Sequence, residues 1–131
     1  MIVGLGIDLV EEDRAAASLA RWGGRLVDKL MDPEEAGRLS ALAESRPRAL
    51  AISIALKEAG SKAIGTGWSR GVRWRDVIVQ PGPPPSVRLA HRALDFARRL
   101  GSSGRTEALV EIRGDLVLAE VRLLTGDAEG R

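Results

Sequence analysis

The segment from residue 49 to residue 64 constrains the fold of this chain more than any other. It contains no helix breaker except Gly60, and Ala, Leu and Ile fill most of its positions. Apolar residues fall on all sides of the expected helix, which is typical of a buried helix rather than of a surface helix. We therefore expect a long central helix that other elements cover.

Three charged residues interrupt this apolar helix: Lys57, Glu58 and Lys62. A buried carboxylate is costly unless a cation meets it. Glu58 and Lys62 are four residues apart, so an ordinary ion pair along the helix is one explanation, and on an exposed helix it contributes only about 0.2–0.5 kcal/mol. The alternative is a functional site on this helix.

The residues that follow the helix favour an anion site. Gly65 is placed to adopt the left-handed conformation that closes a helix. Thr66 and Gly67 then leave a small loop with free backbone N–H groups, a candidate anion-binding nest. Because a helix C-terminus carries partial negative charge, a phosphate here would need Lys62 and a metal ion to reverse the local sign.

The N-terminal segment supplies a second carboxylate. Residues 2–10 are almost entirely apolar, so we expect a strand that is central in its sheet or covered on both faces. Asp8 interrupts this strand. A buried Asp needs a metal ion, an arginine or several N–H donors, although capping of the next helix is a common structural use of Asp.

Composition limits the chemistry. The 131 residues include no Cys and one His, His91, which we expect on the surface, so a zinc cluster and a histidine-based triad are excluded. A metal ion would instead be bound by oxygen atoms, as Mg²⁺ is, and Asp8 with Glu58 fits that description. The net charge of +2 and the few aromatic residues argue against nucleic acid as a partner. No apolar run reaches membrane-spanning length and no signal peptide is evident, so we expect a cytoplasmic protein without a membrane partner.

Several motifs together resemble the holo-acyl-carrier-protein synthase family of 4′-phosphopantetheinyl transferases. They are Gly6-Ile7-Asp8-Leu9-Val10-Glu11, Lys57-Glu58-Ala59, Lys62-Ala63, Gly65-Thr66-Gly67 and Gly71-Val72-Arg73-Trp74-Arg75-Asp76-Val77. They occur in the order of the family and at about its spacing. The resemblance covers residues 1 to about 90 and is loose after that.

The resemblance implies an α+β fold in which an antiparallel sheet packs on the long central helix, in a single domain over residues 1–124. It implies transfer of 4′-phosphopantetheine from coenzyme A to a serine of an acidic acyl carrier protein, with release of adenosine 3′,5′-bisphosphate, by a homotrimer with active sites between subunits. The base would be Glu58 or a water on the metal ion. The implied site residues are Asp8 and Glu58 for Mg²⁺, Glu58 and Lys62 for catalysis, Lys62, Gly65, Thr66, Gly67 and Pro85 for coenzyme A, and Arg14, Arg21 and Arg25 for the carrier protein.

The chain departs from the family at two places. The late strand of the family carries a serine-rich motif that ends in a histidine, whereas residues 108–112 here lack it and place Ile112 or a neighbour at that position. The central helix of the family has Arg-Phe where this chain has Ser53 and Ile54. The alternative is therefore a catalytically degenerate homologue that binds or regulates carrier proteins.

Outside these motifs, local patterns predict the remaining elements. Asp32 and Pro33 mark a helix start, Gly23-Gly24 a helix end, and Gly114 a tight hairpin. The expected helices are 13–22, 25–31, 33–44 and 91–100, the expected strands are 72–80, 86–90, 107–113 and 115–124, residues 101–104 form a flexible loop, and residues 125–131 form a flexible tail.

Overall fold

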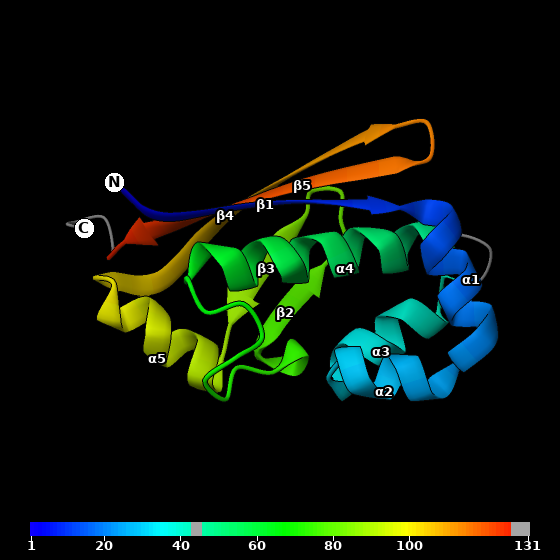
Figure 1. The fold of residues 1–131 in the computed structure, drawn as a ribbon, viewed down its shortest axis with the longest axis horizontal. Helices are drawn as coiled ribbons and strands as arrows, with labels where there is room; N and C mark the ends of the chain where they lie inside the picture. The colour runs from blue at the N-terminus through cyan, green and yellow to red at the C-terminus, as the bar shows by residue number, and fades with distance from the viewer. Residues whose placement is uncertain (43–45, 127–131) are drawn as a thin grey trace.

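The computed structural model describes residues 1–42 and 46–126 and is organised around helix α4 (Arg46–Ala63). This helix lies between two antiparallel sheets (Figure 1). The larger sheet has the strand order β1-β5-β4 and the smaller one pairs β2 with β3. The strands are β1 (Ile2–Glu11), β2 (Val77–Gln80), β3 (Ser86–Leu89), β4 (Ser102–Arg113) and β5 (Leu116–Thr125).

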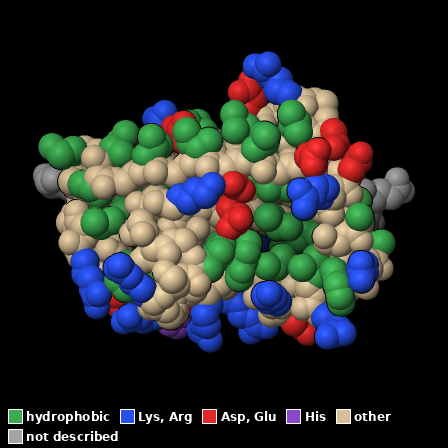
Figure 2. Space-filling view, in the orientation of Figure 1, with side chains coloured by type: hydrophobic (Ala, Val, Ile, Leu, Met, Phe, Trp, Pro, Cys, Tyr) green, Lys and Arg blue, Asp and Glu red, His purple; other side chains and the backbone are tan. Residues whose placement is uncertain are grey.

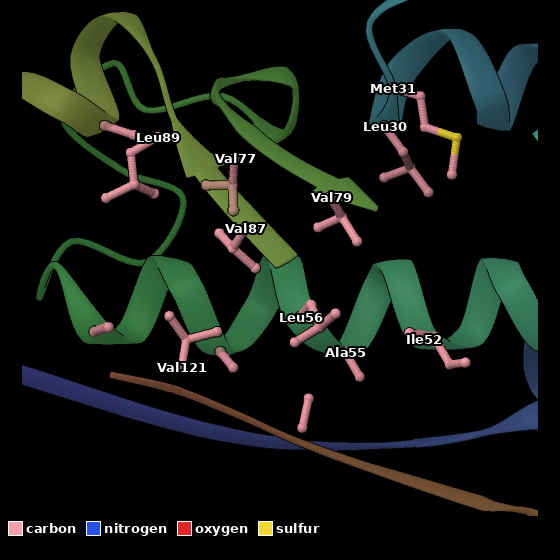
Figure 3. Packing of buried hydrophobic residues seen from close by; sticks show 14 of the residues in the cluster. Leu30, Met31, Ile52, Ala55, Leu56, Val77, Val79, Val87, Leu89 and Val121 are labelled. Carbon is pink, nitrogen blue, oxygen red and sulfur yellow. The ribbon is translucent and has the colours of Figure 1, made fainter. Parts of the chain in front are cut away.

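Both sheets contribute to one core around α4. Leu50, Ala55, Leu56 and Ala59 have no exposed surface. Figure 3 shows valines of β2 and β3 on one side of the helix and Val121 of β5 on the other. An apolar surface on every side of α4 is what two covering sheets require. The predicted buried central helix and the predicted α+β class are confirmed.

Two glycines let β1 lie directly on α4. A Cβ atom at Gly6 would stand 1.8 Å from the carbonyl oxygen of Ala59, and one at Gly4 would stand 2.0 Å from the carbonyl oxygen of Ala63. Any side chain at these positions would force the strand away from the helix. The close approach brings Asp8, two residues after Gly6, against the helix that carries Glu58.

The prediction that β1 is central or covered on both faces is wrong. Among the residues that the structure describes, the strand pairs with β5 alone and forms an edge of the larger sheet. Its outward residues Leu5, Ile7 and Leu9 are each about half exposed (53%, 49% and 54%). Glycines on the inward side disguise the alternation that would have marked a strand with one buried face.

The helices α1 (Glu12–Trp22), α2 (Gly24–Leu30) and α3 (Pro33–Ser40) gather at one end of α4, and α5 (His91–Arg99) lies at the other (Figure 1). As predicted, α1 ends at Gly23, which has a φ of 51°, and Asp32 caps α3. The side chain of Asp32 accepts from the backbone N–H of Glu35, and the Glu35 side chain accepts from that of Asp32. Helix α3 is shorter than predicted, because it ends at Ser40. Residues 43 and 44 of the expected span lie outside the described residues.

Three other boundaries differ from the prediction. Residues 72–76 are not strand: Trp74–Asp76 form a 3₁₀ turn, closed by the Asp76 carboxylate accepting from the Arg73 N–H at 2.9 Å. The expected flexible loop 101–104 is mostly strand, since β4 begins at Ser102, with an irregular register before Thr106. Thr125 ends β5, and residues 127–131 of the expected tail lie outside the described residues.

No helix in the parts of the chain that the structure describes combines the length and the apolar character needed to cross a membrane. The predicted surface position of His91 is confirmed, because its side chain is exposed at the start of α5.

Candidate active-site groove

A groove of about 510 Å³ lies between β1, α1 and α4. Asp8 from the strand and Glu58 from α4 both line it, and Arg14 from α1 borders it. Figure 2 shows basic and acidic side chains side by side near the middle of this face of the molecule. The two carboxylates that the sequence analysis paired are therefore brought to one place by the packing of β1 on α4.

Lys62 forms an ion pair with Asp8. Its Nζ lies 2.9 Å from Asp8 Oδ1 and also donates to the carbonyl oxygen of Ile7 at 3.2 Å. The Lys62 side chain is 52% exposed, so it can turn from the carboxylate toward a ligand at little cost. Pairing of Lys62 with Glu58 along the helix is not what the structure shows, because Lys62 reaches across to β1 instead.

The Glu58 carboxylate has a different partner. The indole N–H of Trp68, in the loop after α4, donates to Glu58 Oε1. The sequence analysis did not identify Trp68 as part of the site. A buried or half-buried tryptophan needs a hydrogen-bond acceptor for its indole N–H. The sequence therefore indicates that Trp68 has an acceptor, but it does not indicate which residue supplies it.

Lys57 points away from the groove. Successive residues of a helix are about 100° apart, so Lys57 enters the core where Glu58 faces outward. Its Nζ lies 2.9 Å from Glu35 Oε2 and donates to the carbonyl oxygen of Trp74 at 3.0 Å. Burial lowers the pKa of Lys57 from its ordinary value of 10.5, and the Glu35 carboxylate opposes that shift. Glu35 thus balances a buried cation on α4 and also completes the cap of α3.

The loop of Gly65, Thr66 and Gly67 differs from the predicted nest. The N–H of Gly65 donates to the carbonyl oxygen of Lys62 at 3.0 Å, and the N–H of Gly67 donates to that of Ser61 at 3.1 Å. Gly65 and Gly67 have φ values of 83° and 57°, the left-handed conformation that closes the helix. Of the two amides expected to be free, that of Gly67 is therefore engaged with α4, as is the amide of Gly65.

The three arginines assigned to the carrier protein fall in two places. Arg14 borders the groove, and its side chain is 84% exposed. Arg21 and Arg25 flank the half-exposed ring of Trp22, with guanidinium carbons 4.9 Å and 5.8 Å from the ring centre. All three lie on α1 and α2.

The carboxylates of Asp8, Glu11 and Glu58 line the groove, but they are not gathered into a complete metal site. Within residues 1–42 and 46–126, no group of three or more acidic or histidine side chains is assembled that would hold a metal ion. Mg²⁺ keeps several waters and is commonly bound by one or two carboxylates together with substrate phosphates. Asp8 and Glu58 fit such an ion. Lys62 donates to one oxygen of Asp8 and Trp68 donates to one oxygen of Glu58, which leaves the second oxygen of each carboxylate for the metal ion.

Residues 4–119 match the family model of the 4′-phosphopantetheinyl transferase superfamily. The chain belongs to this superfamily. It is 41% identical over 104 residues to the holo-[acyl-carrier-protein] synthase of Solibacter usitatus. This alignment covers 77% of this chain and 82% of that protein. The chain is 40% identical over 108 residues to that of Acidithiobacillus ferrooxidans, covering 81% and 84%.

A solved structure shows the same fold. The crystal structure of holo-[acyl-carrier-protein] synthase from Neisseria meningitidis aligns with a TM-score of 0.80 over 95% of this chain and all of that chain, at 27% identity. The predicted resemblance and fold are confirmed. So is the predicted class of enzyme, a phosphopantetheinyl transferase of the holo-acyl-carrier-protein synthase type.

Pro85 lies away from the groove of the transferase. It lines a second groove of about 480 Å³, between the start of α4, the β2–β3 connection and β4. Ile112, at or near the position of the missing histidine, lines the same second groove. A single chain therefore does not bring Pro85 to Asp8 and Glu58.

Proposed function

We propose that this transferase moves 4′-phosphopantetheine from coenzyme A to a serine of an acidic acyl carrier protein and requires Mg²⁺. The observation that carries the proposal is the groove in which Asp8 and Glu58 come together, with Lys62 paired to Asp8 at 2.9 Å. Acidic side chains that line an open groove, with an amine paired to one of them, suit a diphosphate and a divalent ion better than an apolar ligand.

The reaction is a phosphoryl-type transfer in which the serine oxygen forms a bond to the phosphorus that carries pantetheine. The bond from that phosphorus to the bridging oxygen breaks, and adenosine 3′,5′-bisphosphate leaves. The proton of the serine passes to a base in the groove, for which Glu58 is our candidate. Most of the rate gain in such transfers comes from positioning and charge stabilisation.

Asp8 and Glu58 would hold the Mg²⁺ ion, which when bound neutralises charge on the diphosphate. Lys62 would exchange its contact with Asp8 for one with a phosphate oxygen as negative charge enters the groove. Since Gly65 and Gly67 donate their N–H groups to α4, we assign the loop's contact with phosphate to Thr66 and keep the two glycines as the residues that shape it.

The carrier protein would dock on α1 and α2. Arg14 stands at the groove with an exposed guanidinium, and Arg21 and Arg25 extend the positive charge along the same helices. An acidic partner is steered toward such a surface, and this attraction weakens as salt is added. Docking there would place the carrier serine beside Asp8 and Glu58.

Assembly into a trimer would complete the site. The outward face of the larger sheet carries exposed apolar side chains, which is unusual for a monomer. Pro85 lies in its own groove and would meet coenzyme A only if a second copy of the chain presented it. Sedimentation velocity is expected to show three copies. The half-exposed side chains on this face include Leu5, Ile7, Leu9 and Leu109.

The test is a transfer assay with Mg²⁺, coenzyme A and several apo carrier proteins, read by mass spectrometry. We expect a carrier to gain the mass of one phosphopantetheine, and we expect Glu58→Gln to abolish that gain. Glu34→Gln, an exposed acid on α3, is the matched control and should transfer normally. Tight carrier binding without a mass gain would instead favour the degenerate homologue, for which the absence of the late histidine is the supporting observation.

A further inference from the structure

The Glu58 carboxylate is held by a donor that neither the metal ion nor the phosphates supply. Trp68 donates its indole N–H to Glu58 Oε1 from the loop that follows α4. A glutamate side chain has three rotatable bonds, so a free Glu58 would sample several positions in the groove. One hydrogen bond to Oε1 restricts those positions and leaves Oε2 for another ligand.

The Trp68 ring is itself fixed by stacking. It lies on the ring of Trp74, with the ring centres 4.1 Å apart and the planes inclined by 22°. Stacked aromatic pairs contribute about 0.5–1.5 kcal/mol beyond their buried area. Both rings are partly buried against the hydrophobic core. The stacking therefore restricts the position of the Trp68 ring, and with it the direction of the N–H group that donates to Glu58.

Trp74 is in turn tied to the core. Its carbonyl oxygen accepts from Nζ of Lys57, a side chain with no exposed surface, at 3.0 Å. Glu35 fixes that amine at 2.9 Å. A continuous series of contacts thus links two adjacent residues of α4. Lys57 donates to the carbonyl oxygen of Trp74, the Trp74 ring stacks on Trp68, and Trp68 donates to Glu58.

We infer that Trp68 is a positioning residue, which orients Glu58 to bind the divalent ion through its second oxygen. The inference rests on the proposed function of Glu58. Partners that hydrogen-bond a metal-binding carboxylate fix its orientation, and losing one typically lowers metal affinity or activity about 10- to 100-fold. The donor belongs to a side chain outside the motifs that identified the site.

Trp68→Phe tests the inference, because it keeps a ring on Trp74 and removes only the N–H donor. We expect the Mg²⁺ concentration for half-maximal transfer to rise about tenfold, with an unchanged KM for the carrier protein, which docks on other helices. Trp74→Phe is the matched variant: it alters the stack and keeps the Trp68 donor, so its Mg²⁺ requirement should rise less. Equal losses in both variants would overturn the role of the N–H.

A second measurement needs no catalysis. In a ¹H–¹⁵N spectrum of the full chain, the indole signal that disappears in Trp68→Phe belongs to Trp68. We expect this signal to shift in Glu58→Gln, and to shift when Mg²⁺ and coenzyme A are added to the wild-type protein. A Trp68 signal that does not move in either experiment would overturn the inference, whatever the activity of Trp68→Phe.

The outcomes separate this inference from the proposed function. If Glu58→Gln transfers as well as wild type, the proposed role of Glu58 is wrong and the positioning role fails with it. If Glu58→Gln is inactive and Trp68→Phe keeps the wild-type Mg²⁺ requirement, only the positioning role is wrong. If wild type modifies no carrier, the response of the Trp68 signal to Mg²⁺ decides alone.

Discussion

Helix α4 carries two lysine–carboxylate pairs with the same nitrogen–oxygen distance and opposite surroundings. Lys57 meets Glu35 at 2.9 Å with side chains 0% and 2% exposed. Lys62 meets Asp8 at 2.9 Å with side chains 52% and 18% exposed. Distance alone therefore does not separate a structural pair from a functional one, whereas solvent access and the number of other partners do.

The buried pair has every polar atom committed. Besides Glu35, the Lys57 amine donates to the carbonyl oxygens of Trp74 and Val77, and Glu35 accepts from the N–H of Val79 at 2.7 Å. Neither partner can turn to a ligand without leaving a buried charge unpaired. Lys62 is half exposed and is paired with Asp8, which lines the groove, so it can change partners when a phosphate arrives.

Lys57→Met should break the buried pair with the largest effect in the molecule. Glu35 would keep its charge without its cation, which costs about 3–5 kcal/mol of unfolding free energy. Chemical denaturation measures it. The double variant Glu35→Leu/Lys57→Met should lose less than the two single variants together, because no buried charge is left. If the unfolding free energy of Lys57→Met lay within about 1 kcal/mol of the wild-type value, a structural role for the pair would be contradicted.

Lys62→Ala should do the reverse. We expect kcat/KM for transfer to fall about 10²- to 10³-fold, as when one donor to a developing charge is removed. The unfolding free energy should change by less than about 1 kcal/mol, because the pair with Asp8 is largely solvated. The same denaturation series and the transfer assay check both halves. A large stability loss with normal transfer would erase the contrast with Lys57.

The pH dependence of stability is the finest test of the contrast. Burial lowers the pKa of Lys57 in the folded state below its unfolded value near 10.5. Between these two pKa values the unfolded chain binds more protons, so the unfolding free energy of wild type should rise with pH up to about 10.5. Lys57→Met should lack this contribution. If the unfolding free energies of wild type and Lys57→Met changed in parallel from pH 7 upward, the burial of Lys57 would make no pH-dependent contribution to stability and the prediction would be wrong.

The sequence contained enough to place the site on two elements. Asp8 in an apolar strand and Glu58 on an apolar helix were both out of place locally, and burial makes such charges conspicuous. The structure brings them to one groove because Gly4 and Gly6 present no side chain to α4 and so let β1 lie directly on it. The glycines were visible in the sequence, and their packing role was not.

What the sequence determined by itself is therefore the local conformation: a central helix that is apolar on all sides and closed at Gly65, with charged residues at fixed angles around its axis, and a separate helix, α3, that is capped at Asp32. Only the tertiary structure decided which partner each charge meets. Lys57 pairs with Glu35 and Lys62 pairs with Asp8, whereas Glu58 accepts a hydrogen bond from Trp68. The reason is physical, because helix periodicity follows from neighbouring residues alone, whereas each partner comes from a segment placed by packing on a different face of the helix.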